Sequence, residues 1–193
     1  PERERMMMCM IKSYKQLMKL YRVVEYRACA TSAMRDAANG QKILKKILKE
    51  TGINIEIIPG SEEARLLCDN SVESGYARKG NYAYMDVGGG STEISMISDG
   101  RIVGSCSYNL GTLRILGGAV EEGEVEKMKE ELAAYAADYK DISIIGSGGN
   151  INKLCRLYDS GKGKKSKDTL PVDGLRKVYD EMKGMTYRER IDR

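Results

Sequence analysis

The sequence contains no histidine, no phenylalanine and no tryptophan among its 193 residues. The absence of histidine excludes serine–histidine and cysteine–histidine nucleophiles, imidazole metal ligands and histidine phosphotransfer. No other side chain has an unperturbed pKa close to neutrality. Acid–base chemistry in this chain must therefore rely on carboxylates.

Long apolar runs are also missing, since no stretch approaches 18 uninterrupted apolar residues. The first 16 residues, PERERMMMCMIKSYKQ, carry too much charge for a signal peptide. Residues of apolar type make up 41% of the chain and charged residues 31%, which is typical of soluble globular proteins. We expect a cytoplasmic protein with no membrane partner.

Paired cysteines are absent as well. The cysteines are five in number, widely separated and never in a Cys-x-x-Cys pair, which argues against a disulfide framework or a thiolate zinc site. We expect reduced thiols in the core. The net charge of +4 is too small to indicate a nucleic-acid partner, although it favours polyanionic ligands.

The apolar spacing predicts helices that alternate with strands along the whole length. Helices are expected from Met6 to Tyr21 and from Asn39 to Glu50, and Ser61 is expected to cap a third. Further helices are expected to begin near Gly111-Thr112 and to span 125–139, 151–158 and, as the last one, 170–184. Strands are expected at 22–30, 53–60, 81–87, 91–98, 101–108 and 141–146. This order predicts an α/β fold, with an antiparallel meander turning at Asp99-Gly100.

A glycine-rich segment, MDVGGGSTE, follows one of these strands. Glycines in its centre can take dihedrals closed to other residues, and their amides can approach phosphate oxygens directly. The hydroxyls of Ser91 and Thr92 are expected to add donors. Asp86 and Glu93 lie at the two shoulders, where Mg²⁺ could bridge both carboxylates to a phosphoryl oxygen. A flexible linker remains the alternative. The three glycines are Gly88, Gly89 and Gly90.

A second glycine turn, IIGSGGNINKL, connects a strand to a helix, where free amides and the helix dipole favour an anion or a nucleotide. Its glycines are Gly146, Gly148 and Gly149. The spacing is neither that of a dinucleotide-binding fingerprint nor that of a Walker loop.

A third set of polar residues comes from ATSAMRDAANG and SEEAR. Arg35 is expected either to contact phosphate or to pair on the surface with Asp36 or Glu25. Glu62 and Glu63 are either partners of a helix dipole or, in the case of Glu63, a group that orients a water against a terminal phosphate.

These segments together resemble a known family. The order ATSAMRDAANG, TGINIEIIPGSEEARLL, MDVGGGSTEISMI and IIGSGGNINKL is similar to that of the exopolyphosphatase and guanosine pentaphosphate phosphatase family of the actin-like ATPase superfamily. The resemblance covers roughly residues 5 to 190. It implies two actin-like α/β domains with ribonuclease-H-like sheets, in which residues 1–68 form the C-terminal part of the first domain and 69–193 the second.

The resemblance also implies roles for individual residues. Glu63 would position the attacking water, Asp86 and Glu93 would serve catalysis and hold Mg²⁺, and Arg35 would contact phosphate. Gly146, Gly148 and Gly149 would form the glycine turn on the nucleotide side. The implied reaction is hydrolysis of the terminal phosphoanhydride of inorganic polyphosphate or of the γ-phosphate of pppGpp. Homodimers are common among such proteins.

One motif of the family is missing. No Asp-x-Gly-Ser-Asn-x-x-Arg phosphate loop occurs in the chain, so the first domain is expected to be incomplete and both ends look clipped. A non-catalytic module therefore remains the alternative function. It would bind polyphosphate or a guanosine penta- or tetraphosphate through the glycine loops and the lysines of residues 161–168, without turnover. Those lysines are Lys162, Lys164, Lys165 and Lys167.

Overall fold

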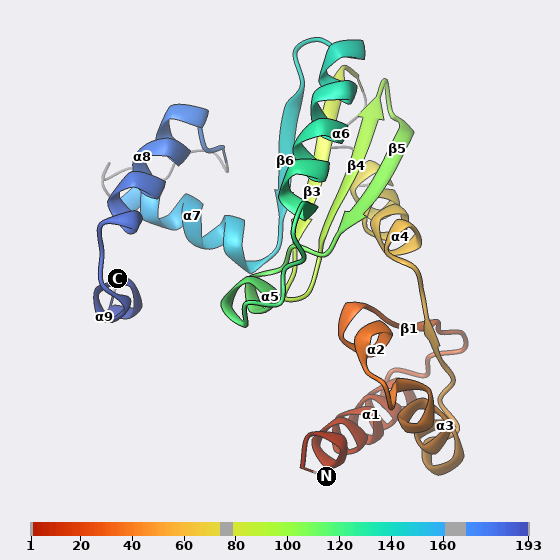
Figure 1. Cartoon of the computed structure of the whole chain (residues 1–193). Helices are drawn as coiled ribbons and strands as arrows, with labels where there is room; N and C mark the ends of the chain where they lie inside the picture. The colour runs from red at the N-terminus through yellow and green to blue at the C-terminus, as the bar shows by residue number, and fades with distance from the viewer. Residues whose placement is uncertain (1, 74–78, 161–168, 193) are drawn as a thin grey trace.

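The computed structural model describes residues 2–73, 79–160 and 169–192 (Figure 1). Helices and strands alternate through these ranges, as the apolar spacing predicts. The helices are α1 (Glu2–Leu20), α2 (Ser32–Asp36), α3 (Gly40–Thr51), α4 (Gly60–Glu73), α5 (Thr112–Leu116), α6 (Glu124–Asp138), α7 (Gly149–Ser160), α8 (Val172–Lys183) and α9 (Tyr187–Asp192). The strands are β1 (Ala28–Ala30), β2 (Ile55–Ile57), β3 (Asn81–Val87), β4 (Thr92–Ser98), β5 (Arg101–Tyr108) and β6 (Ser143–Ser147).

The N-terminal elements pack around their own apolar cluster. Helices α1 and α3 lie side by side, and β1 pairs in parallel with β2. Apolar side chains from both helices and from the loop before β2 fill the space between them, because each helix carries its apolar residues along one side. The buried members are Met8, Ile11, Leu44, Ile47 and Ile53.

The remaining strands form one sheet in the order β5-β4-β3-β6. Strands β3, β4 and β5 are an antiparallel meander, and β6 lies parallel to β3 at one edge. The predicted turn at Asp99-Gly100 is confirmed, with φ of 47° and 76° at the two residues. These are the left-handed values that a two-residue hairpin turn requires.

Helices cover the two faces of this sheet (Figure 1). Because side chains alternate along a strand, Ala83, Ile94 and Met96 face α6. Tyr84 and Ile97 point to the other face, where they pack with Cys68 of α4. Helix α4 therefore crosses the sheet on the side away from α6.

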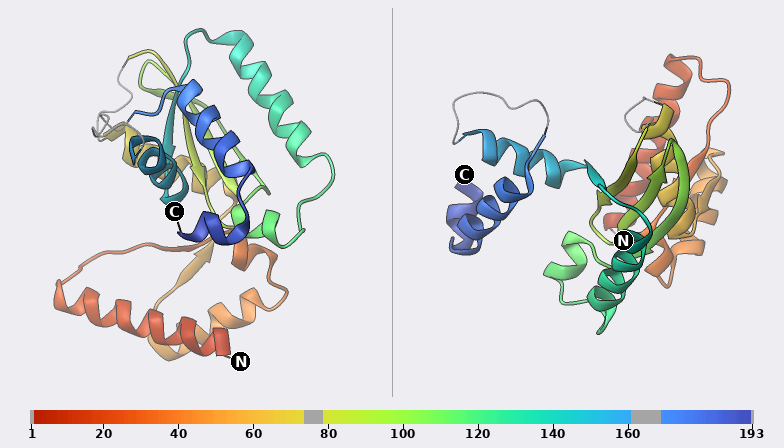
Figure 2. Two further views of the ribbon diagram at one scale, coloured as in Figure 1. Left: turned by 90° about the vertical axis from the view of Figure 1, so that its left-hand side faces the viewer. Right: turned by 90° about the horizontal axis from the view of Figure 1, so that it is seen from above.

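Helices α7, α8 and α9 extend away from the sheet beyond β6 (Figure 2). Leu157 of α7 and Val178 of α8 are buried, and Gly174 leaves room for the ring of Tyr158. These contacts join α7 to α8 rather than to the sheet. None of the described helices is both long and apolar enough to cross a bilayer.

Several sequence-based expectations need correction. The strand expected at 22–30 is limited to Ala28–Ala30, and α4 begins at Gly60, so Ser61 lies inside the helix and does not cap it. Helix α9 follows the helix expected to be the last. Cys9 and Cys29 are exposed, not core thiols.

Two further expectations stay open. The lysines expected in a loop at residues 161–168 lie outside the described residues. The division into domains after Cys68 stays a prediction, and it falls inside α4.

The approach of α4 to the sheet gives a testable prediction at Gly60, where a Cβ atom would overlap the side chain of Ser107 on β5. We expect Gly60→Ala to lower the free energy of unfolding by about 1–3 kcal/mol in urea denaturation, the usual cost of overpacking. Gly149 is the matched control, because it is also the first residue of a helix and a Cβ there meets nothing within 4 Å. An equal loss of stability in Gly149→Ala would contradict this explanation.

Candidate active site

Two acidic residues face each other at one end of the sheet. Asp86 near the end of β3 pairs in register with Glu93 near the start of β4. Side chains of directly paired residues lie on the same face of a sheet. Ser107 of β5 pairs with Glu93 and shares that face, which is the one that α4 crosses. The polar end of this face thus collects carboxylates and hydroxyls.

Glu93 is almost completely buried, with 2% of its surface exposed. The Ser107 hydroxyl donates a hydrogen bond of 2.9 Å to its carboxylate. Burial is the main cause that raises the pKa of Glu93 above its usual value, and the carboxylates of Glu63 and Asp86 raise it further. The hydroxyls of Ser91 and Ser107 act in the opposite direction. The three acids therefore lie within electrostatic reach of one another.

Glu63 enters the site from the first turn of α4 and is paired with Arg35 of α2. Nη1 of Arg35 lies 3.1 Å from a Glu63 carboxylate oxygen and donates a 2.7 Å hydrogen bond to the carbonyl of Ile58. The alternative prediction, that Arg35 pairs with Asp36 or Glu25, is wrong. Glu62 points elsewhere, because it pairs with Arg27 at 2.7 Å.

The glycine segment forms the loop of the β3–β4 hairpin, closed by a 3.0 Å hydrogen bond from the Gly88 amide to the Ser91 carbonyl. Residues 112–114 donate hydrogen bonds to its carbonyls. Gly88 O accepts from the Thr112 amide at 3.0 Å, and Gly89 O accepts from the amides of residues 113 and 114 at 2.8 and 3.1 Å. Gly90 O accepts from Nε of Arg114 at 2.7 Å.

This arrangement fixes the direction of three successive amides. In a trans peptide the carbonyl and the following N–H point in opposite directions. Because the carbonyls of Gly88, Gly89 and Gly90 all point to residues 112–114, the N–H groups of Gly89, Gly90 and Ser91 all point away from them. The Gly89 and Gly90 amides donate to no group within the described part of the chain. Successive free amides of this kind make an anion-binding concavity.

The reason for glycine in this loop differs from the expectation. None of the three residues has a φ in the left-handed region, so the predicted need for unusual dihedrals is wrong. Close approach is the cause instead. A Cβ on Gly90 would overlap the Ser32 hydroxyl of α2, and one on Gly89 would lie 3.1 Å from the Leu113 side chain.

The second glycine turn lies beside Asp86. Gly148 has a φ of 93°, and a Cβ there would lie 3.1 Å from Oδ1 of Asp86. Nδ2 of Asn150 donates a 3.0 Å hydrogen bond to the Val87 carbonyl, which ties the start of α7 to the end of β3. Gly149 begins α7, whereas Gly146 accommodates the side chain of Ile151. The two glycine segments are therefore neighbours at the carboxyl ends of β3 and β6.

One expected ligand has another task. The Thr92 hydroxyl donates to the carbonyl of Leu110 and is buried on the opposite face from Glu93. This hydroxyl therefore has no proton left for a phosphate. The Ser91 side chain also has a partner within the protein, because it interacts with Glu93.

Sequence reasoning missed several residues of the site. Ser32, Ser107, Arg114 and Asn150 all touch the glycine loop, Glu93 or the strand end beside them. They lie in unrelated segments and have no common spacing. Asn150 alone had a local signal, because it directly follows the second glycine turn.

The donor set suits a magnesium ion. Mg²⁺ is usually held by one or two carboxylates together with waters and phosphate oxygens of a substrate. Asp86 and Glu93 supply two carboxylates beside free amides, and a cation would offset their repulsion. No group of three or more Asp, Glu, Cys or His side chains is arranged as a metal site in the described ranges. The pair therefore fits an ion that shares its ligands with a substrate.

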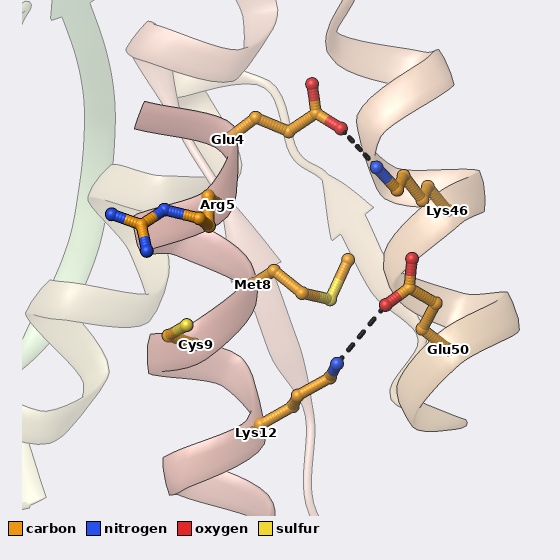
Figure 3. A pocket seen from close by; sticks show the side chains of 7 residues that line it. All are labelled: Glu4, Arg5, Met8, Cys9, Lys12, Lys46 and Glu50. Atoms are coloured by element: carbon orange, nitrogen blue, oxygen red, sulfur yellow. Dashed lines mark hydrogen bonds and ion pairs between the residues drawn. The ribbon is translucent and has the colours of Figure 1, made fainter. Parts of the chain in front are cut away.

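A hollow of about 360 Å³ lies elsewhere, between α1 and α3 (Figure 3). Its charged side chains pair with each other: Lys46 lies 2.8 Å from Glu4 and Lys12 lies 3.2 Å from Glu50. These pairs join the two helices across the hollow. We place the candidate site at the glycine hairpin, where free amides and close carboxylates coincide.

Comparison with known proteins gives a family match over nearly the whole chain. The model of the Ppx/GppA phosphatase family matches residues 2–192. A bifunctional 3-dehydroquinate synthase/phosphatase of Fusobacterium nucleatum is 32% identical over 183 residues, which are 82% of this chain and 27% of that protein. Exopolyphosphatase 1 of Mycobacterium tuberculosis is 27% identical over 87% of this chain and 54% of its own length.

A third relative is a guanosine-5'-triphosphate,3'-diphosphate pyrophosphatase of Aeromonas hydrophila, 28% identical over 75% of this chain and 31% of that protein. The chain thus spans about half or less of the curated relatives it matches. Among solved structures, an exopolyphosphatase of Cytophaga hutchinsonii has a TM-score of 0.80 at 22% identity, over 97% of this chain and 66% of that one. This likeness confirms the expected α/β fold.

The burial of Glu93 predicts how stability depends on pH. Because its pKa is raised in the folded state, the folded chain holds the proton more tightly than the unfolded chain. The contribution of Glu93 to the free energy of unfolding is therefore complete below its pKa in the unfolded chain, about 4.3. It is lost as the pH rises through the raised pKa of the folded chain. We expect Glu93→Gln to be more stable than the parent at pH 8. The difference between the free energies of unfolding of the two chains should decrease toward pH 4.

Urea denaturation between pH 4 and pH 8 in metal-free buffer measures this gap. Glu122→Gln, at an exposed position, is the reference for the loss of one carboxylate. A Glu93→Gln chain that is less stable than the parent at pH 8 would show that the carboxylate is not penalised by burial.

Proposed function

Because the chain belongs to the Ppx/GppA phosphatase family, we propose that it carries the catalytic groups of a phosphoanhydride hydrolase. The reaction releases the terminal phosphate of inorganic polyphosphate or of pppGpp by attack of a water. The observation that carries this proposal is the hairpin loop with its three aligned amides between Asp86 and Glu93. An anion held there lies beside carboxylates, which must carry any acid–base chemistry in a chain without histidine.

Glu63 is the group proposed to orient the attacking water. It reaches the site from the first turn of α4, and the ion pair with Arg35 holds its carboxylate in place. An ionised carboxylate can accept a hydrogen bond from a water and so orient a lone pair of the water oxygen toward phosphorus. Arg35 lies at the same point and can also contact a phosphate oxygen.

We propose Mg²⁺ as the cofactor, held by Asp86 and Glu93. When bound, the ion would neutralise charge on the phosphoryl oxygens. The chain itself supplies the remaining functions. The amides of Gly89, Gly90 and Ser91 hold phosphate oxygens, and the turn at Gly148 and Gly149 forms the neighbouring wall. Ser107 keeps the Glu93 carboxylate oriented through its 2.9 Å hydrogen bond.

The two candidate substrates share the chemistry that this site would recognise. Both end in a phosphoanhydride with several negative charges, and the chain is positively charged overall at +4. The matched relatives include an exopolyphosphatase and a pyrophosphatase of guanosine-5'-triphosphate,3'-diphosphate. The expected cytoplasmic location, the homodimer and the absence of nucleic-acid and membrane partners stay predictions.

The role of Glu63 can be tested with its neighbour as control. We expect Glu63→Gln to reduce phosphate release at least about 100-fold, because general-base assistance contributes about 10²- to 10⁴-fold. Glu62→Gln removes the same charge one residue away, where the carboxylate pairs with Arg27, and should stay near the parent rate. Phosphate release is measured with Mg²⁺ from polyphosphate and from pppGpp in parallel.

The outcome also separates the two functions considered from the sequence. Turnover that survives Glu63→Gln would remove this residue from the mechanism. Binding of polyphosphate without release by the parent chain would identify a binding module in place of an enzyme.

The metal assignment predicts a defect at Asp86. We expect Asp86→Asn to raise the Mg²⁺ concentration needed for tripolyphosphate binding by at least about tenfold, since even residues that only support metal ligands contribute 10- to 100-fold. Titration calorimetry at a series of Mg²⁺ concentrations measures this value without requiring turnover. Asp138→Asn, at an exposed position on α6, is the control. An unchanged Mg²⁺ requirement in Asp86→Asn would exclude Asp86 as a ligand.

A further inference from the structure

We propose that Arg114 is a positioning residue that holds the Gly90–Ser91 peptide in its phosphate-accepting orientation, and that Asp36 orients Arg114 for this task. The inference rests on the proposed function, because it assigns the amides of the glycine hairpin to phosphate. Arg114 contacts the carbonyls of the loop, on the side opposite its free amides.

Arg114 contacts the loop through both its backbone and its side chain. Its amide donates to the Gly89 carbonyl at 3.1 Å, and its Nε donates to the Gly90 carbonyl at 2.7 Å. The side chain is 17% exposed, and its Nη2 forms an ion pair with Asp36. The guanidinium is thus held at both ends, between the hairpin loop and α2.

The side chain controls one peptide in particular. The carbonyls of Gly88 and Gly89 accept from backbone amides, which glutamine or methionine at residue 114 leaves in place. The Gly90 carbonyl accepts from the Arg114 side chain. Without this donor the Gly90–Ser91 peptide plane is free to rotate, because glycine tolerates a wide range of dihedrals. A rotated plane would turn the Ser91 amide away from the ligand and the carbonyl oxygen toward it.

Asp36 adds a link to the N-terminal elements. Arg35 and Asp36 are adjacent at the end of α2, yet their side chains have different partners. Arg35 pairs with Glu63 on α4, whereas Asp36 pairs with Arg114 on α5. Helix α2 therefore orients the water-positioning carboxylate and the phosphate loop at the same time.

Two substitutions at Arg114 separate the hydrogen bond from the rest of the side chain. In Arg114→Gln, Nε2 takes the place of the arginine Nε, so the donor to Gly90 is kept while the group that pairs with Asp36 is lost. The methionine side chain in Arg114→Met is as long as that of glutamine. It places a methyl group where Nε2 would be and therefore has no donor. Arg101→Met, at the far end of β5, controls for the loss of one positive charge.

The readout is the amide spectrum of the ¹⁵N-labelled full chain during titration with Mg²⁺ and tripolyphosphate. In the parent and in Arg101→Met we expect the amide signals of Gly89, Gly90 and Ser91 to shift on binding. In Arg114→Met the Ser91 shift should disappear and the affinity should fall about 10- to 100-fold, the usual effect of losing a hydrogen bond to a charged group. Arg114→Gln should keep the Ser91 shift, and Asp36→Asn should weaken binding less than Arg114→Met.

Undiminished Ser91 shifts and affinity in Arg114→Met would overturn the inference, and so would a parent chain whose three amides do not respond. If Arg114→Met does not fold, as judged by circular dichroism, a Ser91 shift lost in the folded Arg114→Gln chain would also overturn it. Failure of the proposed function is seen separately. Tripolyphosphate that binds with these shifts but releases no phosphate would refute the hydrolase and support the loop geometry.

Discussion

The close crossing of α4 over one face of the sheet is the contact on which the site depends. Gly60 touches Ser107, the Ser95 hydroxyl reaches the Ala64 carbonyl at 3.2 Å, and Cys68 lies against Tyr84 and Ile97. One end of this interface is apolar and stabilises the packing. The other end is polar and holds Glu63 and Glu93 within electrostatic reach. The same helix therefore anchors the fold and delivers a proposed catalytic group, which couples the stability of the sheet to the geometry of the site.

Much of the fold was predictable because its signals are local. The stripe along α1, the meander with its Asp99-Gly100 turn and the glycine turn before α7 each depend on residues close in sequence. The family resemblance is confirmed by the match over residues 2–192. The error at 22–30 has a non-local cause. Strand β1 is as short as its partner β2, and no pattern within 22–30 reveals where that partner ends.

The site was predictable only in part. Asp86, Glu93 and the glycines between them were found, since they form one short hairpin. The partners that hold these groups, such as Ser107 and Arg114, come from later segments that the fold brings back to the loop. Their contacts are hydrogen bonds to backbone atoms or to a buried carboxylate, and such contacts leave no spacing in the sequence. Tertiary structure, not local pattern, explains why the loop is ordered and why its glycines are needed.

The two adjacent contacts of α2 also limit how this segment can change. A helix turns by about 100° for each residue, so one residue inserted or deleted within α2 would swing both side chains off their partners in a single step. Substitutions elsewhere on the helix surface leave that register intact. An insertion or deletion in residues 32–36 would therefore break two contacts, one with Glu63 and one with Arg114 at the phosphate loop. A substitution of Arg35 or Asp36 would break only one of them.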